Sequence, residues 1–97
     1  MVTVGDIYNY IDTFAPFHTA MGFDNVGLLV GGKHCPVTSV MVSMDITPEV
    51  ISEAVSQKAE LIISHHPVIF QPLKRLSPTD VPYLLVQNGL CAIAAHT

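Results

Sequence analysis

The sequence predicts an α/β fold in which β-α-β units build a mostly parallel sheet in a three-layer arrangement. Two observations lead to this fold class. First, short apolar runs end abruptly in polar residues, as Leu61–Ile63 does before Ser64 and His65. Second, segments with helical spacing alternate with these runs along the chain. Strands of a parallel sheet are buried on both faces, so they read as continuous apolar runs rather than as alternating patterns.

The amino-terminal part predicts a helix followed by a short strand. The helix is expected over residues 3–14, with Thr3 as its N-cap and Pro16 beyond its end. Its apolar face consists of residues at three- and four-residue spacing: Val4, Ile7, Tyr8, Ile11 and Phe14. Asp24 and Asn25, residue types that favour turns, predict a turn before a strand over residues 26–30. These two polar side chains either orient a polar group at the start of the strand or cap a turn.

The middle of the chain predicts a β-α-β unit over residues 40–64. A strand over residues 39–44 ends at Asp45, and a helix follows that reaches about residue 58. Thr47 as N-cap and Pro48 at the first helical position mark the start of this helix. The next strand covers residues 59–64, and a right-handed crossover is expected. Beyond it we expect a loop or short helix, a helix over residues 81–88 and a strand over residues 90–95.

Ligand-type side chains follow three of these predicted strands: Asp45, the pair His65 and His66, and His96. If the strands are parallel, these side chains lie along one edge of the sheet, where α/β proteins bind ligands. Imidazole is the commonest metal ligand among side chains, so the histidine pair predicts a metal site. The alternative is a core histidine beside a surface histidine, because neighbours on a regular strand point to opposite faces. Pro67 favours the metal site, since it restricts the backbone of His66.

The composition narrows the classes of function. The chain has 97 residues with 49% apolar and 12% charged residues and a net charge of −4. This length suits one α/β domain over residues 1–97. The shortage of basic residues disfavours direct binding to nucleic acid. No apolar run reaches the roughly 20 residues of a membrane span, and no leader peptide is evident, so we expect a cytoplasmic protein without membrane contact.

Two further features of the composition concern the surface and the cysteines. The high apolar content predicts that part of the surface is covered by a partner subunit or by a further part of the protein. Cys35 and Cys91 lie far apart in the sequence, and neither belongs to a CxxC motif. They do not form a disulfide framework, and Cys91, inside an apolar run, is expected to be an ordinary buried thiol.

Four segments, in order along the chain, resemble one known family. They are residues 23–31 (FDNVGLLVG), residues 44–54 (MDITPEVISEA), residues 61–70 (LIISHHPVIF) and residues 95–97 (AHT). Together they resemble the signatures of the GTP cyclohydrolase I type 2 homologue family, whose members contain two metal ions and assemble as toroidal hexamers. The chain departs from the family pattern at Phe23, where tryptophan is usual. It also stops at Thr97, before the family's further ligands, namely an aspartate, a histidine and a glutamate. We therefore expect an apparently truncated chain, the N-terminal part of a larger two-lobed fold.

The resemblance implies a site and a cofactor. His65 and His66 match metal ligands, whereas His96, Asp45 and Asp24 match positions close to the metals or lining the same cleft. The implied cofactor is two divalent ions per subunit, and imidazole with carboxylate ligands is compatible with zinc, iron, manganese or nickel. The resemblance further implies a homo-oligomer, the toroidal hexamer.

Three functions remain open at this point. The first is a metal-dependent hydrolase acting on a small molecule or nucleotide, either as a GTP cyclohydrolase or as a phosphoesterase. The second is a non-catalytic metal-binding protein with an interaction or regulatory role. The third is an inactive fragment, because two histidines alone do not complete a two-metal site. No glycine-rich phosphate-binding motif is present in the sequence.

Overall fold

The computed structural model describes residues 1–19 and 25–95, and it confirms the predicted α/β fold. A four-stranded sheet has the order β1-β4-β3-β2. Its strands are β1 (Gly27–Val30), β2 (Val40–Ser43), β3 (Leu61–Ser64) and β4 (Cys91–Ala94). Strands β2, β3 and β4 are parallel, and β1 pairs antiparallel with β4. The sheet is therefore mostly parallel, with β2 at one edge and β1 at the other.

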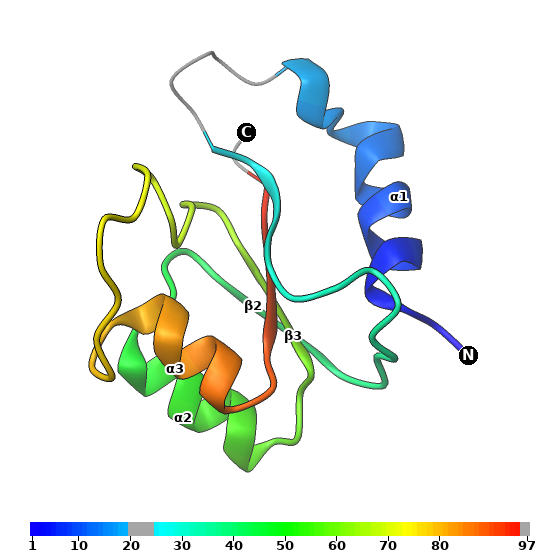
Figure 1. The fold of residues 1–97 in the computed structure, drawn as a ribbon. Helices are drawn as coiled ribbons and strands as arrows, with labels where there is room; N and C mark the ends of the chain where they lie inside the picture. The colour runs from blue at the N-terminus through cyan, green and yellow to red at the C-terminus, as the bar shows by residue number, and fades with distance from the viewer. Residues whose placement is uncertain (20–24, 96–97) are drawn as a thin grey trace.

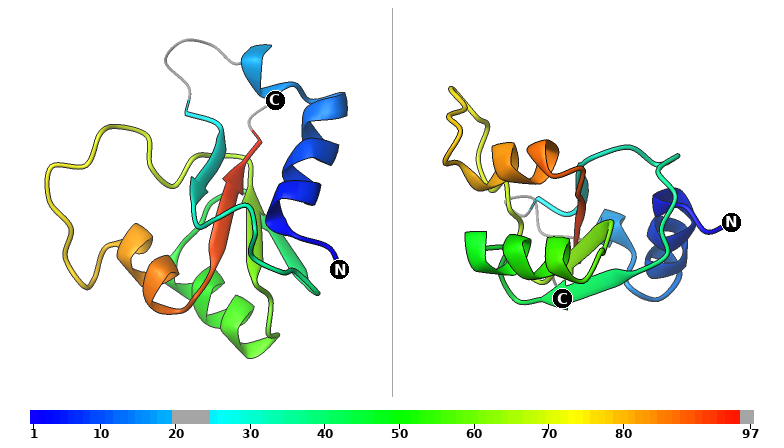
Figure 2. Two further views of the ribbon diagram at one scale, coloured as in Figure 1. Left: turned by 45° about the vertical axis from the view of Figure 1, so that its right-hand side comes forward. Right: turned by 90° about the horizontal axis from the view of Figure 1, so that it is seen from below.

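The helices cover the two faces of this sheet unequally. They are α1 (Val4–Phe14), the short 3-10 helix η1 (Phe17–Thr19), α2 (Pro48–Ser56) and α3 (Val81–Gln87). Helix α1 lies on one face, whereas α2 and α3 lie together on the other (Figures 1 and 2). Residues 68–80, which the sequence assigned to a loop or short helix and the next helix start, form an exposed loop with no helix. The result is three layers, with the sheet in the middle.

Local capping explains where the first two of these helices begin. Thr3 and Asp6 form a reciprocal capping box at the start of α1, in which each side chain accepts a hydrogen bond from the other's backbone amide. Thr47 caps α2 by accepting from the amide of Val50, and Pro48 occupies the first turn. Both N-caps were predicted. Helix α2 ends at Ser56, two residues before the predicted end, and Lys58 then adopts a φ of 59°.

Two apolar layers pack on opposite faces of the sheet. Leu61 and Ile93 face α1, where they pack with Val4 and Ile11. Their strand neighbours point the other way and meet α2 and α3 in a second cluster that includes Ile51, Ala54, Ile62, Leu85 and Ala92. This alternation follows from the two-residue period of a strand. Because both faces of β3 and β4 are covered, their side chains are mainly apolar throughout. No helix in the described ranges has the length and apolar character to cross a membrane.

Candidate metal centre

Two serines in register end the neighbouring strands β2 and β3. Ser43 and Ser64 are partners in the parallel ladder. The hydroxyl of Ser43 donates to the carbonyl oxygen of Asp45 at 2.8 Å, and that of Ser64 donates to the carbonyl oxygen of His66 at 2.7 Å. Such a bond, from a side chain to the backbone two residues ahead, turns the chain out of strand geometry. The same turn thus follows both strands at the same level of the sheet.

Backbone hydrogen bonds continue this pairing beyond the ends of the strands. The amide of His65 donates to the carbonyl oxygen of Ser43 at 3.2 Å, and that of His66 donates to Met44 at 3.0 Å. On the other side of β3, the amide of Ala95 donates to Ser64 at 2.9 Å. The carboxyl ends of β2, β3 and β4 therefore meet at one edge of the sheet, as the sequence predicted.

Asp45 and His66 form a direct side-chain pair at this edge. Their Oδ1 and Nδ1 atoms lie 2.8 Å apart. A carboxylate can only accept, so Nδ1 is the donor, and in the neutral form of such a ring Nε2 carries the lone pair. The His66 side chain is 47% exposed and that of Asp45 63% exposed, so the pair lies at the surface. This arrangement, in which a carboxylate fixes the tautomer of an imidazole, is the common support for a metal-binding histidine.

His65 lies beside His66 rather than on the opposite face. The two ring centroids are 4.9 Å apart, with the planes inclined by 70°. His65 is partly buried, and its Nδ1 atom is covered by protein. The alternative in which the two histidines point apart required regular strand geometry, but β3 ends at Ser64. The turn after Ser64 therefore brings both imidazoles to the same edge.

Two predicted site residues, Asp24 and His96, lie outside the described residues. Their neighbours are placed, however. The side-chain amide of Asn25 donates to the carbonyl oxygen of Ile69 at 2.6 Å, which ties the start of β1 to the segment that follows the histidine pair. This bond joins two segments that are distant in the sequence, and both interpretations of the Asp24–Asn25 turn stay predictions.

The donor chemistry of this edge fits a divalent metal ion, but the number of donors is low. Two imidazoles, one of them oriented by a carboxylate, are ligands of the type that zinc and other transition metals prefer. Among residues 1–19 and 25–95, no group of three or more histidine, cysteine or carboxylate side chains is arranged to hold a metal. At least two further ligands are therefore needed to reach four-coordination.

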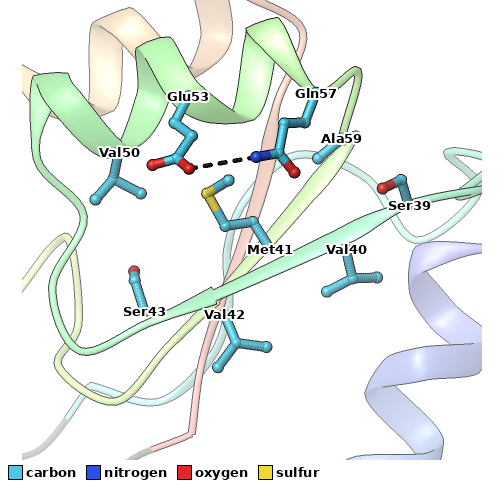
Figure 3. Close-up of a pocket in the computed structure, with 9 residues that line it drawn as sticks. All are labelled: Ser39, Val40, Met41, Val42, Ser43, Val50, Glu53, Gln57 and Ala59. Carbon is cyan, nitrogen blue, oxygen red and sulfur yellow. Dashed lines mark hydrogen bonds between the residues drawn. The ribbon is translucent and has the colours of Figure 1, made fainter.

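A groove of about 320 Å³ lies between β2 and α2 and reaches Ser43 at the end of β2. Figure 3 shows Met41 pointing toward α2, below Glu53 and Gln57, while Val40 and Val42 point away from that helix. The side-chain amide of Gln57 donates to Glu53 at 3.3 Å across the top of the groove. The groove is lined by aliphatic and neutral polar side chains apart from Glu53, so it offers no obvious catalytic group.

Comparison with known proteins identifies the family. The model of DUF34/NIF3, described as NGG1p interacting factor 3, matches residues 2–97. The chain belongs to the DUF34/NIF3 family. A relative in Staphylococcus aureus, called GTP cyclohydrolase 1 type 2 homolog, is 38% identical over 97 residues, which is 97% of this chain and 26% of the relative. A Clostridium perfringens relative of the same name is 38% identical over 99 residues, 97% of this chain and 37% of its own length.

Solved structures of DUF34/NIF3 relatives share this fold. A hypothetical protein of Staphylococcus aureus superimposes with a TM-score of 0.92 at 37% identity, covering 98% of this chain and 28% of that one. A Bacillus cereus protein related to NIF3 gives a TM-score of 0.90 at 34% identity, covering 97% of this chain and 27% of that one. The chain thus spans between 26% and 37% of the length of these relatives, and the family resemblance in the sequence is confirmed.

Ser43 and Ser64 shape the turns at this edge, and the sequence analysis did not single them out. Ser64 is the one buried polar side chain among the described residues, at 2% exposure. A signal was present in the sequence, because each serine ends an apolar run and precedes a ligand-type residue by two positions. Only the register of β2 against β3 shows that the two signals belong to one edge.

Proposed function

We propose that His65 and His66 are ligands of a dinuclear divalent-metal centre, and that the complete protein is a metal-dependent hydrolase. The observation that carries the proposal is the hydrogen bond between Asp45 and Nδ1 of His66, which directs Nε2 of that ring outward as a ligand. The ring of His65 stands 4.9 Å from it, close enough to serve a second ion of the same centre. Zinc, iron, manganese and nickel all suit these ligands.

Each described residue of this edge has a defined task in the proposed centre. His65 and His66 bind, Asp45 orients His66, and Ser64 holds the backbone of His66 through its hydroxyl. When bound, a pair of divalent ions supplies Lewis-acid activation of water and polarises a carbonyl or phosphoryl oxygen. The remaining ligands come from beyond the described residues, either in a longer chain of the kind the relatives have or in a neighbouring subunit. The substrate is a small molecule or nucleotide, as the relatives' name suggests.

Metal content per chain tests this proposal. The protein is purified without chelators or metal-affinity resin, and zinc, iron, manganese and nickel are measured by elemental analysis. We expect bound metal that is lost in the His65→Ala/His66→Ala double variant and retained in His34→Ala, which removes an exposed loop histidine away from the site. Equal metal content in all three proteins would contradict the centre. Failure of the metal-loaded protein, at the full length of its relatives, to hydrolyse GTP or phosphoesters would contradict the hydrolase.

A second candidate function, a non-catalytic interaction protein, is favoured by the exposed apolar edge at β2. Val40, Val42 and Met44 are 39%, 75% and 60% exposed, although they lie on or next to a strand. Strand β2 carries no charge or proline to protect its free edge. We propose a second copy of the chain as the occupant, because this uncharged strand can pair antiparallel with itself. The partner surface then belongs to the homo-oligomer, the toroidal hexamer, that the family resemblance implies.

The oligomeric state tests this second candidate. Light scattering after gel filtration is expected to show an assembly for the wild-type protein and a smaller species for Val42→Lys. Val86→Lys is the matched control, since Val86 is 68% exposed on α3, away from this edge. A monomer at all concentrations, or equal effects of the two lysines, would contradict it. If the assembly forms equally well in the His65→Ala/His66→Ala variant, the interaction does not need metal, which favours the interaction role over the hydrolase.

A further inference from the structure

The two cysteines, Cys35 and Cys91, meet at the end of the sheet opposite the histidine edge. Cys91 is the first residue of β4, and Cys35 lies in the loop that runs from β1 to β2. Both belong to the apolar cluster beneath α1. Both are free cysteines. Their large separation in the sequence gave no reason to pair them, and the structure brings them together.

A pair of adjacent glycines allows this approach. Gly31 has a φ of +101°, and a side chain there would overlap Sγ of Cys91 and lie 2.8 Å from its Cβ. A side chain at Gly32 would lie 3.9 Å from Sγ of Cys35. The amide of Cys35 donates to the carbonyl oxygen of Gly32 at 3.2 Å, which folds the loop back on itself. Both sulfur atoms thus lie against one dipeptide, within one apolar cluster.

The two thiols differ in their access to solvent. Cys91 is 4% exposed, whereas Cys35 is half-buried. Burial, together with the contact with Cys35, raises the pKa of the Cys91 thiol above its usual value. The thiolate is the reactive form of cysteine, so Cys35 is the thiol that an oxidant in solution can reach first. Cys91 lies in the same cluster, buried beside Cys35, which is the position of a resolving thiol.

We propose that Cys35 and Cys91 form a reversible dithiol–disulfide site that is oxidised by hydrogen peroxide. The Cys35 thiolate attacks the peroxide, an S–O bond forms as the O–O bond breaks, and the departing hydroxide takes a proton to become water. The sulfur of Cys91 then attacks the sulfenic acid of Cys35, so that the S–S bond forms as the S–O bond breaks. The displaced hydroxide takes the Cys91 proton and leaves as a second water. The two thiols lose two electrons and two protons, and one peroxide becomes two waters.

Oxidation at this site would link the loop that holds α1 covalently to the sheet. The loop that carries Cys35 already holds the start of α1, because the amide of Val4 donates to Cys35 at 2.9 Å and that of Gly5 donates to Lys33 at 2.8 Å. The amide of Val37 likewise donates to Val2 at 2.8 Å. A disulfide to Cys91 would join this loop to β4, the strand between β1 and β3. The oxidised protein is therefore expected to unfold at a higher temperature than the reduced protein.

Mass spectrometry of the peroxide-treated protein tests the proposal. The reaction contains a chelator, so that metal-catalysed oxidation at the histidines does not contribute, and free thiols are then alkylated. We expect a monomer lighter by two hydrogens, no alkylation at either cysteine, a cross-linked Cys35–Cys91 peptide, and full reversal by dithiothreitol. Two alkylated cysteines after treatment, or a disulfide between two chains, would overturn the proposal. None of these results depends on the metal centre, so they do not test the hydrolase.

Two variants separate the roles of the thiols. In Cys91→Ala the sulfenic acid at Cys35 has no resolving partner, and dimedone is expected to trap it. In Cys35→Ser the trapped fraction at Cys91 is expected to fall at least about tenfold, because Cys91 is buried. Equal trapping in both variants would overturn the assigned order of attack. Circular dichroism checks that each variant folds, and if Cys91→Ala does not, the wild-type cross-link decides the proposal alone.

Discussion

Nδ1 of His66 lies 2.8 Å from Oδ1 of Asp45, and this contact joins the ends of two strands that are separated by helix α2 in the sequence. It exists because Ser43 and Ser64 are in register and each turns the chain in the same way. An imidazole held in one tautomer by a carboxylate presents one nitrogen as a fixed ligand. The sheet therefore positions the imidazole and the carboxylate on which the proposed metal centre relies.

Replacing Asp45 by alanine is expected to weaken metal binding without unfolding the protein. Loss of such a supporting carboxylate typically costs roughly 10- to 100-fold in metal affinity, and the Asp45 side chain is 63% exposed, so little packing is lost. Competition with a chromophoric chelator measures the affinity for zinc. Glu49→Gln, an exposed carboxylate on α2, is the control. An unchanged affinity in Asp45→Ala would mean that His66 needs no orienting partner.

Replacing Ser64 by alanine is expected to affect both stability and metal binding. The hydroxyl is buried, and its loss leaves the carbonyl oxygen of His66 without this donor, at a cost of about 1–3 kcal/mol in the free energy of unfolding. Because the turn after β3 loosens, zinc affinity is expected to fall as well. Urea denaturation and the chelator competition measure the two effects. Ser43→Ala removes a more exposed hydroxyl in the same role, so it should lower the free energy of unfolding by less. An equal loss in the two variants would show that burial of the hydroxyl does not determine the loss of stability.

Gly31 is expected to tolerate no side chain. Alanine there would adopt a φ of +101° and overlap the sulfur of Cys91, so Gly31→Ala should lower the free energy of unfolding by at least about 2 kcal/mol. Gly32→Ala is the matched control, because its added carbon would lie 3.9 Å from the nearest atom, Sγ of Cys35. This variant should stay within about 1 kcal/mol of the wild type. If the two variants unfold at the same urea concentration, the glycine turn does not pack closely on Cys91.

Glu60 is expected to contribute to the acid dependence of stability. Its carboxylate accepts from the amides of Thr38 and Ser39 at 2.9 and 3.0 Å. The hydrogen bond from the backbone of Thr38 has the largest effect, and together these bonds lower the pKa of Glu60 below its usual value. The folded state therefore holds this proton less tightly than the unfolded state. The contribution is fully present above the usual glutamate pKa of about 4.3 and is lost as the pH falls through the lowered pKa.

Urea midpoints between pH 7 and pH 2 test this dependence. The wild type should lose stability over that acid window more steeply than Glu60→Gln, which carries no titrating group at this position. Glu49→Gln again serves as the control, because its carboxylate is exposed in the first turn of α2. Parallel curves for the wild type and Glu60→Gln would show that these hydrogen bonds do not favour the ionised form.

Much of the fold was predictable because its signals are local. The apolar spacing of Val4 and Ile11, the caps at Thr3 and Thr47, and the apolar runs of β3 and β4 each act within a few residues. Boundaries moved by one or two residues, as at the end of α2, because helix ends depend on contacts as well as on propensity. The antiparallel direction of β1 was not predicted, since no local pattern in residues 26–30 fixes which way a strand runs.

The candidate site was predicted in part for the same reason. Histidines and carboxylates after apolar runs mark the carboxyl ends of strands, and parallel strands bring such ends together. His65, His66 and Asp45 were found in this way, and the structure places them at one edge. Asp24 and His96, which belong to the same prediction, lie outside the described residues and remain predictions.

The sequence by itself determined the order of elements, their caps and the residues that follow each strand, because these depend on short-range periodicity and backbone preferences. Only the tertiary structure decided which distant groups touch. The pairing of Ser43 with Ser64, the contact of Asp45 with His66, and the placement of Cys35 and Cys91 in one cluster all depend on strand register and loop path. A one-residue slip of register would reverse the face of every side chain on a strand. These contacts are therefore set by the packing of the whole sheet rather than by any single segment.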